Sequence, residues 1–491
     1  MGWEDPDPAD VVSLLGAKDW ADLRGRYDPN LLGRPLERCL EVARAAGATS
    51  VVIETRYLDL DYRSEYSAFF SKTFAEIPDT AHRLHFFRAD VAAEELVALS
   101  DGAREGYLGY MIMRPSPLGR VGRTVLVPPP DLQDAVHTAI RDTVDFFGQK
   151  LGVTGVPFAQ QDTQFGRCAH VAAWICHYAA HLRGDVMRRP MADFSLFADA
   201  NVAEGRPLPS QGLTGLQLSN LMREFDLPPI VYRMGYLPGS GQEPPLPPHN
   251  QDADPGTWDT RAIAVLCRFL NSAYPMLVGT HEHAFVIIGY LREERDGQHW
   301  ISFVRHDDQR GPYLKVDDIL HDVDPSTGDA YSAWQLLLAP VPDKLWLLPE
   351  AAERTGRDLL LRYDALAGTG TFDDLRAANR LTFRTTAMKS SSYKERATTR
   401  GLDDDSMREL RLARLSRLVW VVEAIDRDAR AAGTPCVIGE AVFDSTSSDV
   451  SPNVLALRVP GALLVTQTDG TIRSPLPATN RPVLSAATFQ P

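Results

Sequence analysis

The sequence predicts an α+β fold in which a helix carries a cysteine and an antiparallel sheet carries a histidine and an aspartate. A helix-forming apolar run begins at Cys168. Further along, residues 283–290 and 299–306 are two apolar, strand-like stretches joined by a short segment that contains Asp296-Gly297. A short connection of this kind joins neighbouring antiparallel strands. We expect two α/β accessory regions to flank this central domain.

The chain is long enough for several domains, since it has 491 residues. We place an amino-terminal accessory region at residues 1–125, a central domain at 126–349 and a carboxy-terminal accessory domain at 350–491. These divisions follow the chemistry, because the residues that suggest a reaction all lie in the central part.

Hydrophobic spacing predicts the elements of the amino-terminal region. Apolar residues at helical intervals favour helices, and runs of β-branched and aromatic residues favour strands. The expected helices are residues 11–15, 36–46, 65–74 and 92–99. The expected strands are residues 50–56, 107–114 and 123–127. Residues 140–147 alternate imperfectly and fit either element.

The central domain is expected to hold three helices beside its strands. They are residues 167–182, a helix that follows Thr214 as its N-cap, and residues 260–270. Residues 230–233 favour a short strand. Residues 237–258 are rich in proline and glycine and poor in apolar side chains, which predicts a mobile surface loop. This loop is either a gate for substrate or a plain insertion.

The carboxy-terminal domain is expected to combine one long helix with strands. Its acidic start at Asp403 and a series of leucines predict an amphipathic helix to about Asp426. Residues 436–443 and 454–458 favour strands.

Composition excludes some classes of partner. Formal net charge is -14, which argues against nucleic acid or an anionic membrane as the main partner. Five cysteines are spread far apart, and an odd, scattered set is typical of a reducing compartment. No secretory signal and no apolar stretch of membrane-spanning length is evident. We therefore expect a cytoplasmic protein.

Cys168 is the strongest candidate for a nucleophile. It lies in the first turn of a predicted helix, where unpaired backbone N–H groups create a partial positive charge. That charge favours the thiolate, which is the reactive form. Cys176 lies two turns further along the same helix, and we interpret it as a core residue.

His283 is the candidate general base and acid, because it opens an apolar strand. Two other histidines are alternatives. His281 shares the strand face of His283 but precedes the apolar run. His170 lies only two residues from Cys168 on the same helix, which points its ring elsewhere.

An aspartate and a glutamine complete the candidate site. Asp307 ends the second strand and would orient the imidazole. Strand alternation places Asp307 and Asp308 on opposite faces, so only one of them can serve, and we favour Asp307. A side-chain amide would help to hold an oxyanion. Gln160, Gln161 and Gln164 are candidates, and we favour Gln161.

Together, residues 154–320 resemble a papain-like cysteine peptidase, nearest the bacteriocin-leader-processing branch. That branch has a glutamine, a cysteine at a helix start, a Gly-Leu-Ser/Thr helix, a histidine-led apolar strand, and an aspartate followed by a glycine. The matching residues are Gln161, Cys168, Gly212 to Thr214, His283, and Asp307 with Gly311. The chain departs from the pattern in the Gln161 spacing, in Asp308 where a proline is usual, and in Arg167-Cys168-Ala169 where Cys-Gly is usual.

The resemblance implies a thiol hydrolase that cleaves peptide or isopeptide bonds through a Cys-His-Asp triad and an acyl-enzyme. Cys168 would attack, His283 would move the proton, Asp307 would orient His283, and Gln161 would hold the oxyanion. The substrate would be a protein or peptide, and the flanking regions would recognise it or dock a protein partner. No metal or cofactor is expected, because no Cys/His cluster has ligand spacing.

Two alternatives remain at this point. The same dyad would serve a thiol acyltransferase or deamidase of transglutaminase type. The chain would otherwise be a non-catalytic module that binds a partner through a peptidase fold.

Overall fold

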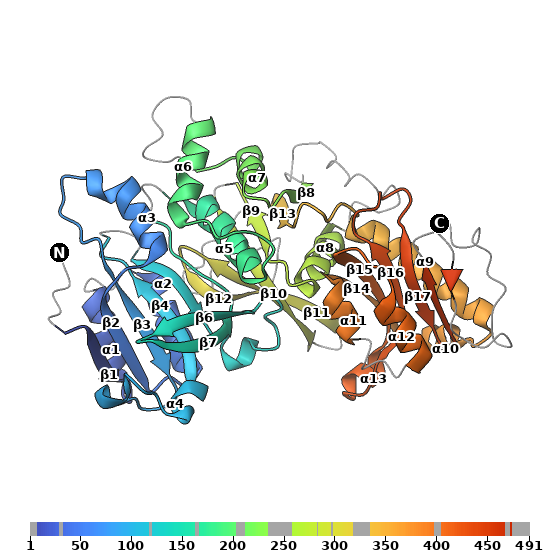
Figure 1. The fold of residues 1–491 in the computed structure, drawn as a ribbon, viewed down its shortest axis with the longest axis horizontal. Coiled ribbons are helices and arrows are strands. Elements are labelled where there is room, and N and C mark those ends of the chain that lie inside the picture. Colours follow the sequence, from blue (N-terminus) through green and yellow to red (C-terminus); the bar gives the residue numbers. More distant parts are fainter. Residues whose placement is uncertain are drawn as a thin grey trace. The chain divides into compact units, whose positions relative to one another are not determined.

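The computed structural model describes residues 7–28, 33–116, 120–162, 166–202, 212–233, 258–281, 283–295, 298–317, 334–396, 404–466 and 472–473 (Figure 1). Within them, strands pair into four sheets, and all these pairs are antiparallel. Helices and antiparallel sheets together confirm the predicted α+β class.

The chain divides into two compact units, which are described separately. Unit 1 comprises Met1–Pro342 and unit 2 comprises Asp343–Pro491. The boundary between them lies close to the one expected at residue 349. The other expected boundary, at residue 125, falls inside unit 1.

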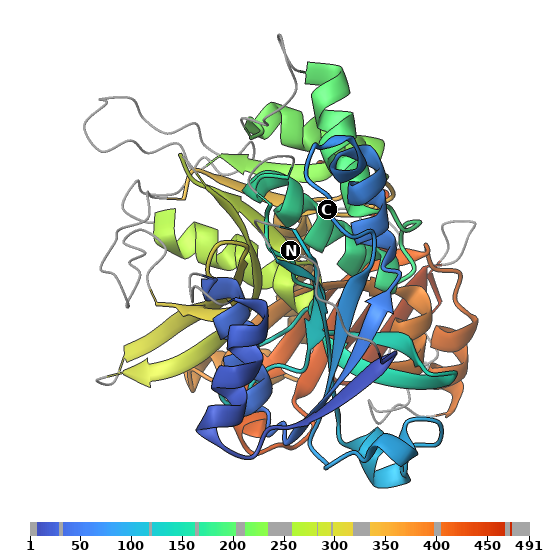
Figure 2. The ribbon, with the colours of Figure 1, turned by 90° about the vertical axis from the view of Figure 1, so that its left-hand side faces the viewer.

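Unit 1 begins with a five-stranded sheet in which the strands follow chain order (Figure 2, dark blue to cyan). The strands are β1 (Ala9–Ser13), β2 (Ser50–Tyr57), β3 (Ala81–Phe87), β4 (Tyr107–Met113) and β5 (Val121–Leu126). The helices of this region are α1 (Ala17–Tyr27), α2 (Arg34–Ala45), α3 (Leu60–Ala68) and α4 (Asp101–Glu105). A hairpin of β6 (Ile140–Phe146) and β7 (Gln149–Gly155) packs against β4 and β5.

The side chains of this sheet alternate between two hydrophobic cores. Val51 and Ile53 of β2 join the core that contains α1, α2 and α5. Val52 joins the core that contains the β6–β7 hairpin and Tyr62 of α3. Residues along a strand point to opposite faces in turn, so the sheet is covered on both faces.

Unit 1 also contains a six-stranded sheet with the order β12-β11-β10-β9-β13-β8. The strands are β8 (Pro229–Arg233), β9 (Met276–Gly279), β10 (Ala284–Arg295), β11 (Gln298–Asp307), β12 (Gly311–Val316) and β13 (Leu336–Pro340). The accompanying helices are α5 (Cys168–Leu182), α6 (Met191–Val202), α7 (Gly215–Glu224) and α8 (Trp258–Asn271). Both α5 and α8 pack against β9 and β10.

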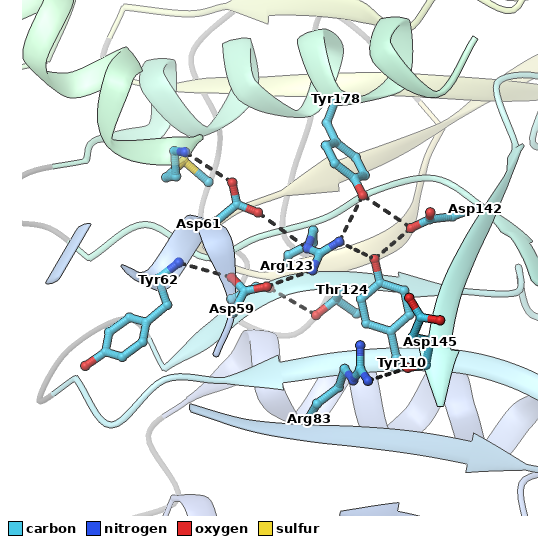
Figure 3. A network of polar contacts seen from close by, with 12 residues as sticks. Asp59, Asp61, Tyr62, Arg83, Tyr110, Arg123, Thr124, Asp142, Asp145 and Tyr178 are labelled. Atoms are coloured by element: carbon cyan, nitrogen blue, oxygen red, sulfur yellow. Dashed lines mark hydrogen bonds and ion pairs between the residues drawn. The ribbon is translucent and has the colours of Figure 1, made fainter. Parts of the chain in front are cut away.

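A buried polar network joins the five-stranded sheet to α5 (Figure 3). Arg123 of β5 donates to Asp59 over 2.7 Å and to the Tyr178 hydroxyl of α5 over 3.0 Å. Asp61 lies 3.4 Å from the same guanidinium, and Tyr178 also donates to Asp142 of β6. These contacts cross the expected boundary at residue 125, which explains why residues 1–342 form one unit.

Three expectations for the amino-terminal region need correction. Residues 11–15 were expected to be helical, but Val11 and Val12 lie in β1, consistent with the strand preference of β-branched side chains. Residues 92–99 contain only a short 3-10 turn at Ala93–Glu95. The helix expected at 65–74 is displaced, since α3 ends at Ala68 and a 3-10 turn, Phe70–Lys72, follows. Residues 140–146 form a strand.

Unit 2 is built on one six-stranded sheet with the order β14-β15-β16-β17-β18-β19. The strands are β14 (Leu381–Lys389), β15 (Leu418–Asp426), β16 (Val437–Asp444), β17 (Val454–Val459), β18 (Ala462–Thr466) and β19 (Ile472–Arg473). The helices are α9 (Pro349–Ala367), α10 (Thr371–Ala377), α11 (Ser390–Arg396), α12 (Asp404–Leu412) and α13 (Arg427–Ala431). The longest, α9, packs across β14 to β17.

The prediction of a long helix between Asp403 and Asp426 is wrong. Helix α12 ends at Leu412, and residues 418–426 form β15, which is buried along its whole length. A strand that is covered on both faces needs apolar residues at consecutive positions, which obscures the two-residue period. The valines at 419, 421 and 422 favour the strand.

Two further points concern the limits of the chain's elements. None of the described helices is long and apolar enough to cross a membrane. Most of the predicted gate loop, residues 237–257, lies outside the described residues, and Trp258 begins α8.

Candidate active site

Cys168 is the first residue of α5, as its position in the sequence predicted. Its side chain is half-buried. The backbone N–H of Arg167, the N-cap, donates to Nδ1 of His170 over 3.2 Å, so the His170 side chain helps to cap the N-terminus of the helix. Just before the helix, the Asp162 carboxylate accepts from the Gly166 N–H over 3.1 Å. Burial lowers the pKa of His170 to about 4, so it is neutral at pH 7 and structural.

The glutamine segment upstream of Cys168 is attached to the amino-terminal sheet. Gln160 donates its N–H to the Val121 carbonyl of β5, and its side-chain oxygen accepts from the Val121 N–H over 3.2 Å. Its amide oxygen is thus committed to the sheet. Gln161 is half-buried, and no hydrogen bond joins it to Cys168 within the described part of the chain. Gln164 lies outside that part, so the oxyanion donor stays a prediction.

His283 lies between the thiol and the carboxylates. It immediately precedes β10, and its side chain is 8% exposed. Nε2 lies 3.1 Å from Oδ1 of Asp307, and the ring is also hydrogen-bonded to Cys168. Because Nε2 faces Asp307, Nδ1 is the nitrogen left for the thiol. His281, two residues earlier, is exposed.

The environment of His283 favours its charged form. Burial alone would lower the pKa of this imidazole. Hydrogen bonds with Asp307 and Cys168, together with the negative charges of Asp307 and Asp308, outweigh burial and raise the pKa to about 10. At neutral pH the ring is therefore an imidazolium, the partner that stabilises a thiolate.

Asp307 and Asp308 both face His283, whereas strand alternation predicted opposite faces. The reason is that β11 ends at Asp307, and Asp308 already belongs to the following turn. Asp307 Oδ1 also accepts from the Gln309 backbone N–H over 3.0 Å. The turn closes at Gly311, whose φ of +122° suits glycine, and a Cβ there would lie 2.5 Å from the Cβ of Arg38.

Asp308 is the unusual member of the cluster. Its Oδ1 lies 3.7 Å from Nε2 of His283, and its side chain is 2% exposed. Both carboxylate oxygens are buried, and no other described residue donates a hydrogen bond to them. Burial and the negative charge of Asp307 raise the pKa of Asp308 to about 8, although the charge of His283 opposes this.

Sequence reasoning missed Gln309. Its side-chain nitrogen lies 3.3 Å from Nδ1 of His283, and its backbone fixes Asp307. The signal that would have found it is the turn after Asp307, because residues in such a turn stay near the strand end.

The cluster brings together a thiol, an imidazole and a carboxylate in hydrogen-bonding order, which is the arrangement for acyl transfer by a thiol. Its nitrogen and carboxylate oxygens are also donors that a metal ion accepts, since one ligand atom each from His283, Asp307 and Asp308 lies within 4.8 Å of the others. Comparison with known proteins adds no assignment: no family model, no curated protein and no solved structure matches the chain.

Proposed function

We propose that the protein is a thiol-dependent hydrolase that cleaves peptide or isopeptide bonds through Cys168, His283 and Asp307. The observation that carries the proposal is the position of His283, which is hydrogen-bonded to the Cys168 thiol on one side and to Asp307 on the other. A raised imidazole pKa of about 10 supports a protonated ring at neutral pH, which can give its proton to the leaving nitrogen.

The proposed reaction has two halves. The Cys168 thiolate attacks the carbonyl carbon of the scissile amide, and a C–S bond forms while the carbonyl electrons move to oxygen. The His283 imidazolium then gives its proton to the leaving nitrogen, the C–N bond breaks, and an acyl-enzyme remains. In the second half, His283 takes a proton from water, which attacks the acyl carbon and releases Cys168. Asp307 keeps the ring oriented throughout.

The oxyanion would be held by the Cys168 backbone N–H, at the unpaired start of α5, and by a side-chain amide. Gln161 is the proposed amide. The side-chain oxygen of Gln160 accepts from the Val121 N–H, which leaves its neighbour as the available glutamine among those described.

A papain-like arrangement is part of the proposal, because a helix-borne cysteine and a sheet-borne histidine and aspartate are what that fold brings together. All five cysteines are free thiols, which supports a reducing compartment such as the cytoplasm. We further propose that unit 2 contributes to recognition of a protein or peptide substrate or partner, since the candidate cluster lies wholly in unit 1.

Competitive alkylation tests the nucleophile, and the chain supplies its own controls. Burial raises the pKa of Cys39 and Cys176, and raises the pKa of Cys267 to about 11, so these thiols should react slowly. Cys436 is half-buried like Cys168 but lies in unit 2, which has no histidine. Iodoacetamide at pH 6 to 7, mapped by mass spectrometry, should label Cys168 first. Labelling of Cys436 first would remove the basis of the proposal.

Substrate identification tests the reaction. Peptide termini are compared across a proteome that has been treated with the wild-type protein or with Cys168→Ala. New termini that depend on Cys168 are expected for a hydrolase. Amine-linked or deamidated glutamines without new termini would identify an acyltransferase or deamidase instead, and the absence of any Cys168-dependent product would favour a binding module.

A further inference from the structure

The second carboxylate beside His283 has no role in the proposed reaction. One carboxylate is enough to orient an imidazole, and Asp307 already does so over 3.1 Å. Asp308 is nevertheless buried against the same ring nitrogen, at 3.7 Å, and its two oxygens accept no hydrogen bond from any other described residue. A buried carboxylate in that condition is destabilising, so its presence needs a further explanation.

Few of the described positively charged groups lie near the two carboxyl groups. Asp307 has His283 and, at 3.8 Å, Nε of Arg305 beside it. For Asp308, the positively charged group within ion-pair distance is His283 alone among the described residues. Buried ionised carboxylates are normally paired or bound to a metal.

The donor set also suits a metal. Nε2 of His283 and one oxygen each of Asp307 and Asp308 lie within 4.8 Å of one another, and all three side chains are buried. Imidazole nitrogen with carboxylate oxygens is a set that Zn²⁺ and related ions accept, commonly with three protein ligands and one water. The backbone of the turn after Asp307 helps to fix these oxygens, since the Gln309 N–H donates to Asp307.

We propose that His283, Asp307 and Asp308 form a binding site for a divalent transition-metal ion such as Zn²⁺, and that the bound ion switches off the Cys168 thiol. A metal on Nε2 would occupy the ring nitrogen that now faces Asp307 and would bind the carboxylate that orients the ring, so His283 could no longer serve Cys168 as an oriented base. The inhibitory part rests on the proposed thiol chemistry, whereas the binding part does not.

Metal titration of the purified full-length protein tests the site. Calorimetry with Zn²⁺ should give one tight site in the wild type, and Asp308→Asn should weaken it at least about tenfold. Cys168→Ala is the matched control and should bind with the wild-type affinity, because the thiol faces the other ring nitrogen. Wild-type affinity in Asp308→Asn, or loss of binding in Cys168→Ala, would overturn the assignment.

Cobalt gives a measurement that does not depend on the folding of any variant. Co²⁺ added to the wild type should produce visible d–d bands without a thiolate-to-cobalt charge-transfer band in the near ultraviolet. A charge-transfer band would place the ion on a cysteine, and no spectral change would mean no site. Either result contradicts the proposal.

The effect of the bound metal on the reactivity of Cys168 is measured in a separate experiment. One equivalent of Zn²⁺ should slow alkylation of Cys168 at least about tenfold, in line with the loss of its basic partner, and EDTA should restore it. If Co²⁺ binds but metal-free Cys168 is unreactive, the metal site stands and the proposed hydrolase fails. If Cys168 is reactive and no metal binds, the proposed hydrolase stands and the metal site fails. Binding without inhibition would overturn the switch alone.

Discussion

A row of charges in unit 2 and the cluster around His283 in unit 1 bury charge in different ways. In unit 2, four charged side chains form a row across β14 to β17, and each acid is matched by a base. Arg384 lies 2.6 Å from Glu423, and Arg458 lies 3.0 Å from Glu440. The two glutamates are cross-strand neighbours and are almost fully buried. In unit 1, the cluster around His283 has two buried carboxylates, and one of them accepts no hydrogen bond from any other described residue.

The difference separates structural from chemical use of buried charge. A matched row of charges helps to fix strand register. It offers little uncompensated charge for a reaction, because its charges are neutralised pairwise. An unmatched cluster is destabilising, and such clusters persist where a reaction or a ligand needs them. The row in unit 2 therefore has a structural explanation, and the His283 cluster calls for a functional one.

The largest effect is expected from the histidine itself. His283→Ala removes the acid and base, and any Cys168-dependent turnover should fall by about 10²- to 10⁴-fold. His281→Ala is the matched control, because His281 is exposed and nearby, and it should retain most of the rate. Steady-state kinetics on a substrate found by terminus mapping would measure both. A larger loss in His281→Ala would move the base to that residue.

Removing one member of the charged row in unit 2 should be costly. Arg458→Met removes the 3.0 Å ion pair of the buried Glu440 and should lower the free energy of unfolding of unit 2 by about 3 kcal/mol. The double variant Arg458→Met with Glu440→Met should recover most of that loss. Hydrogen exchange in urea, followed by mass spectrometry for peptides of each unit, gives the values. An additive loss in the double variant would contradict the idea that pairing is what matters.

Acid should weaken unit 1 through its buried histidines, whereas unit 2 contains no histidine. Burial, with the positive charges of His181 and Arg189, lowers the pKa of His177 to about 4. As pH falls below about 6.5, the unfolded chain binds a proton that folded His177 does not, so stability is lost between about pH 6.5 and 4. The loss reaches about 3 kcal/mol at pH 4.

His177→Phe tests this pH dependence, because the ring lies edge-on to Phe194 and Phe225 and a phenyl group suits that site. The variant should lose less stability than the wild type between pH 7 and pH 4, as measured by urea unfolding of unit 1. His281→Ala, which alters an exposed ring, should keep the wild-type slope. Equal slopes for His177→Phe and the wild type would disprove the assignment.

Removing the buried acid Asp308 from unit 1 should raise the stability of that unit. Asp308→Asn removes an ionisable group whose oxygens are buried without hydrogen bonds among described residues, and should raise the stability of unit 1 by about 1 kcal/mol. Asp307→Asn is the control and should lower stability, because Asp307 accepts from both His283 and Gln309. Thermal unfolding distinguishes the two. Destabilisation by Asp308→Asn would mean that this carboxylate has a structural partner.

Local signals predicted much of the fold and the candidate cluster. Thr214 caps α7 as expected, with its hydroxyl accepting from the Gln217 N–H, and Cys168 begins α5. The errors arose where tertiary packing decides. A central strand such as β15 has no two-residue period, and its apolar run was taken for a helix. Contact of Asp308 with His283 depends on where β11 ends, and the attachment of residues 1–125 depends on Arg123, whose partners are distant in sequence.

Substitution of Gln309 is expected to have the smallest effect on the alkylation of Cys168, and the direction of that effect is informative. As oriented, its side-chain N–H₂ lies 3.3 Å from Nδ1 of His283 and can donate to that nitrogen only when the ring is neutral. That contact opposes the imidazolium, since a protonated Nδ1 cannot accept. Gln309→Ala should therefore speed alkylation of Cys168 slightly, by no more than about tenfold for one hydrogen bond.

The opposite sign has a definite structural meaning. Amide nitrogen and oxygen are assigned from the hydrogen-bond network. With the amide reversed, its oxygen would accept from a protonated Nδ1 and stabilise the imidazolium, and Gln309→Ala would slow alkylation. Gln309→Glu sharpens the comparison, because a carboxylate can only accept and should speed the reaction at pH 6 in either case. Slower alkylation in Gln309→Ala would thus show that the amide has the reversed orientation. No change in either variant would show that Gln309 does not act on His283.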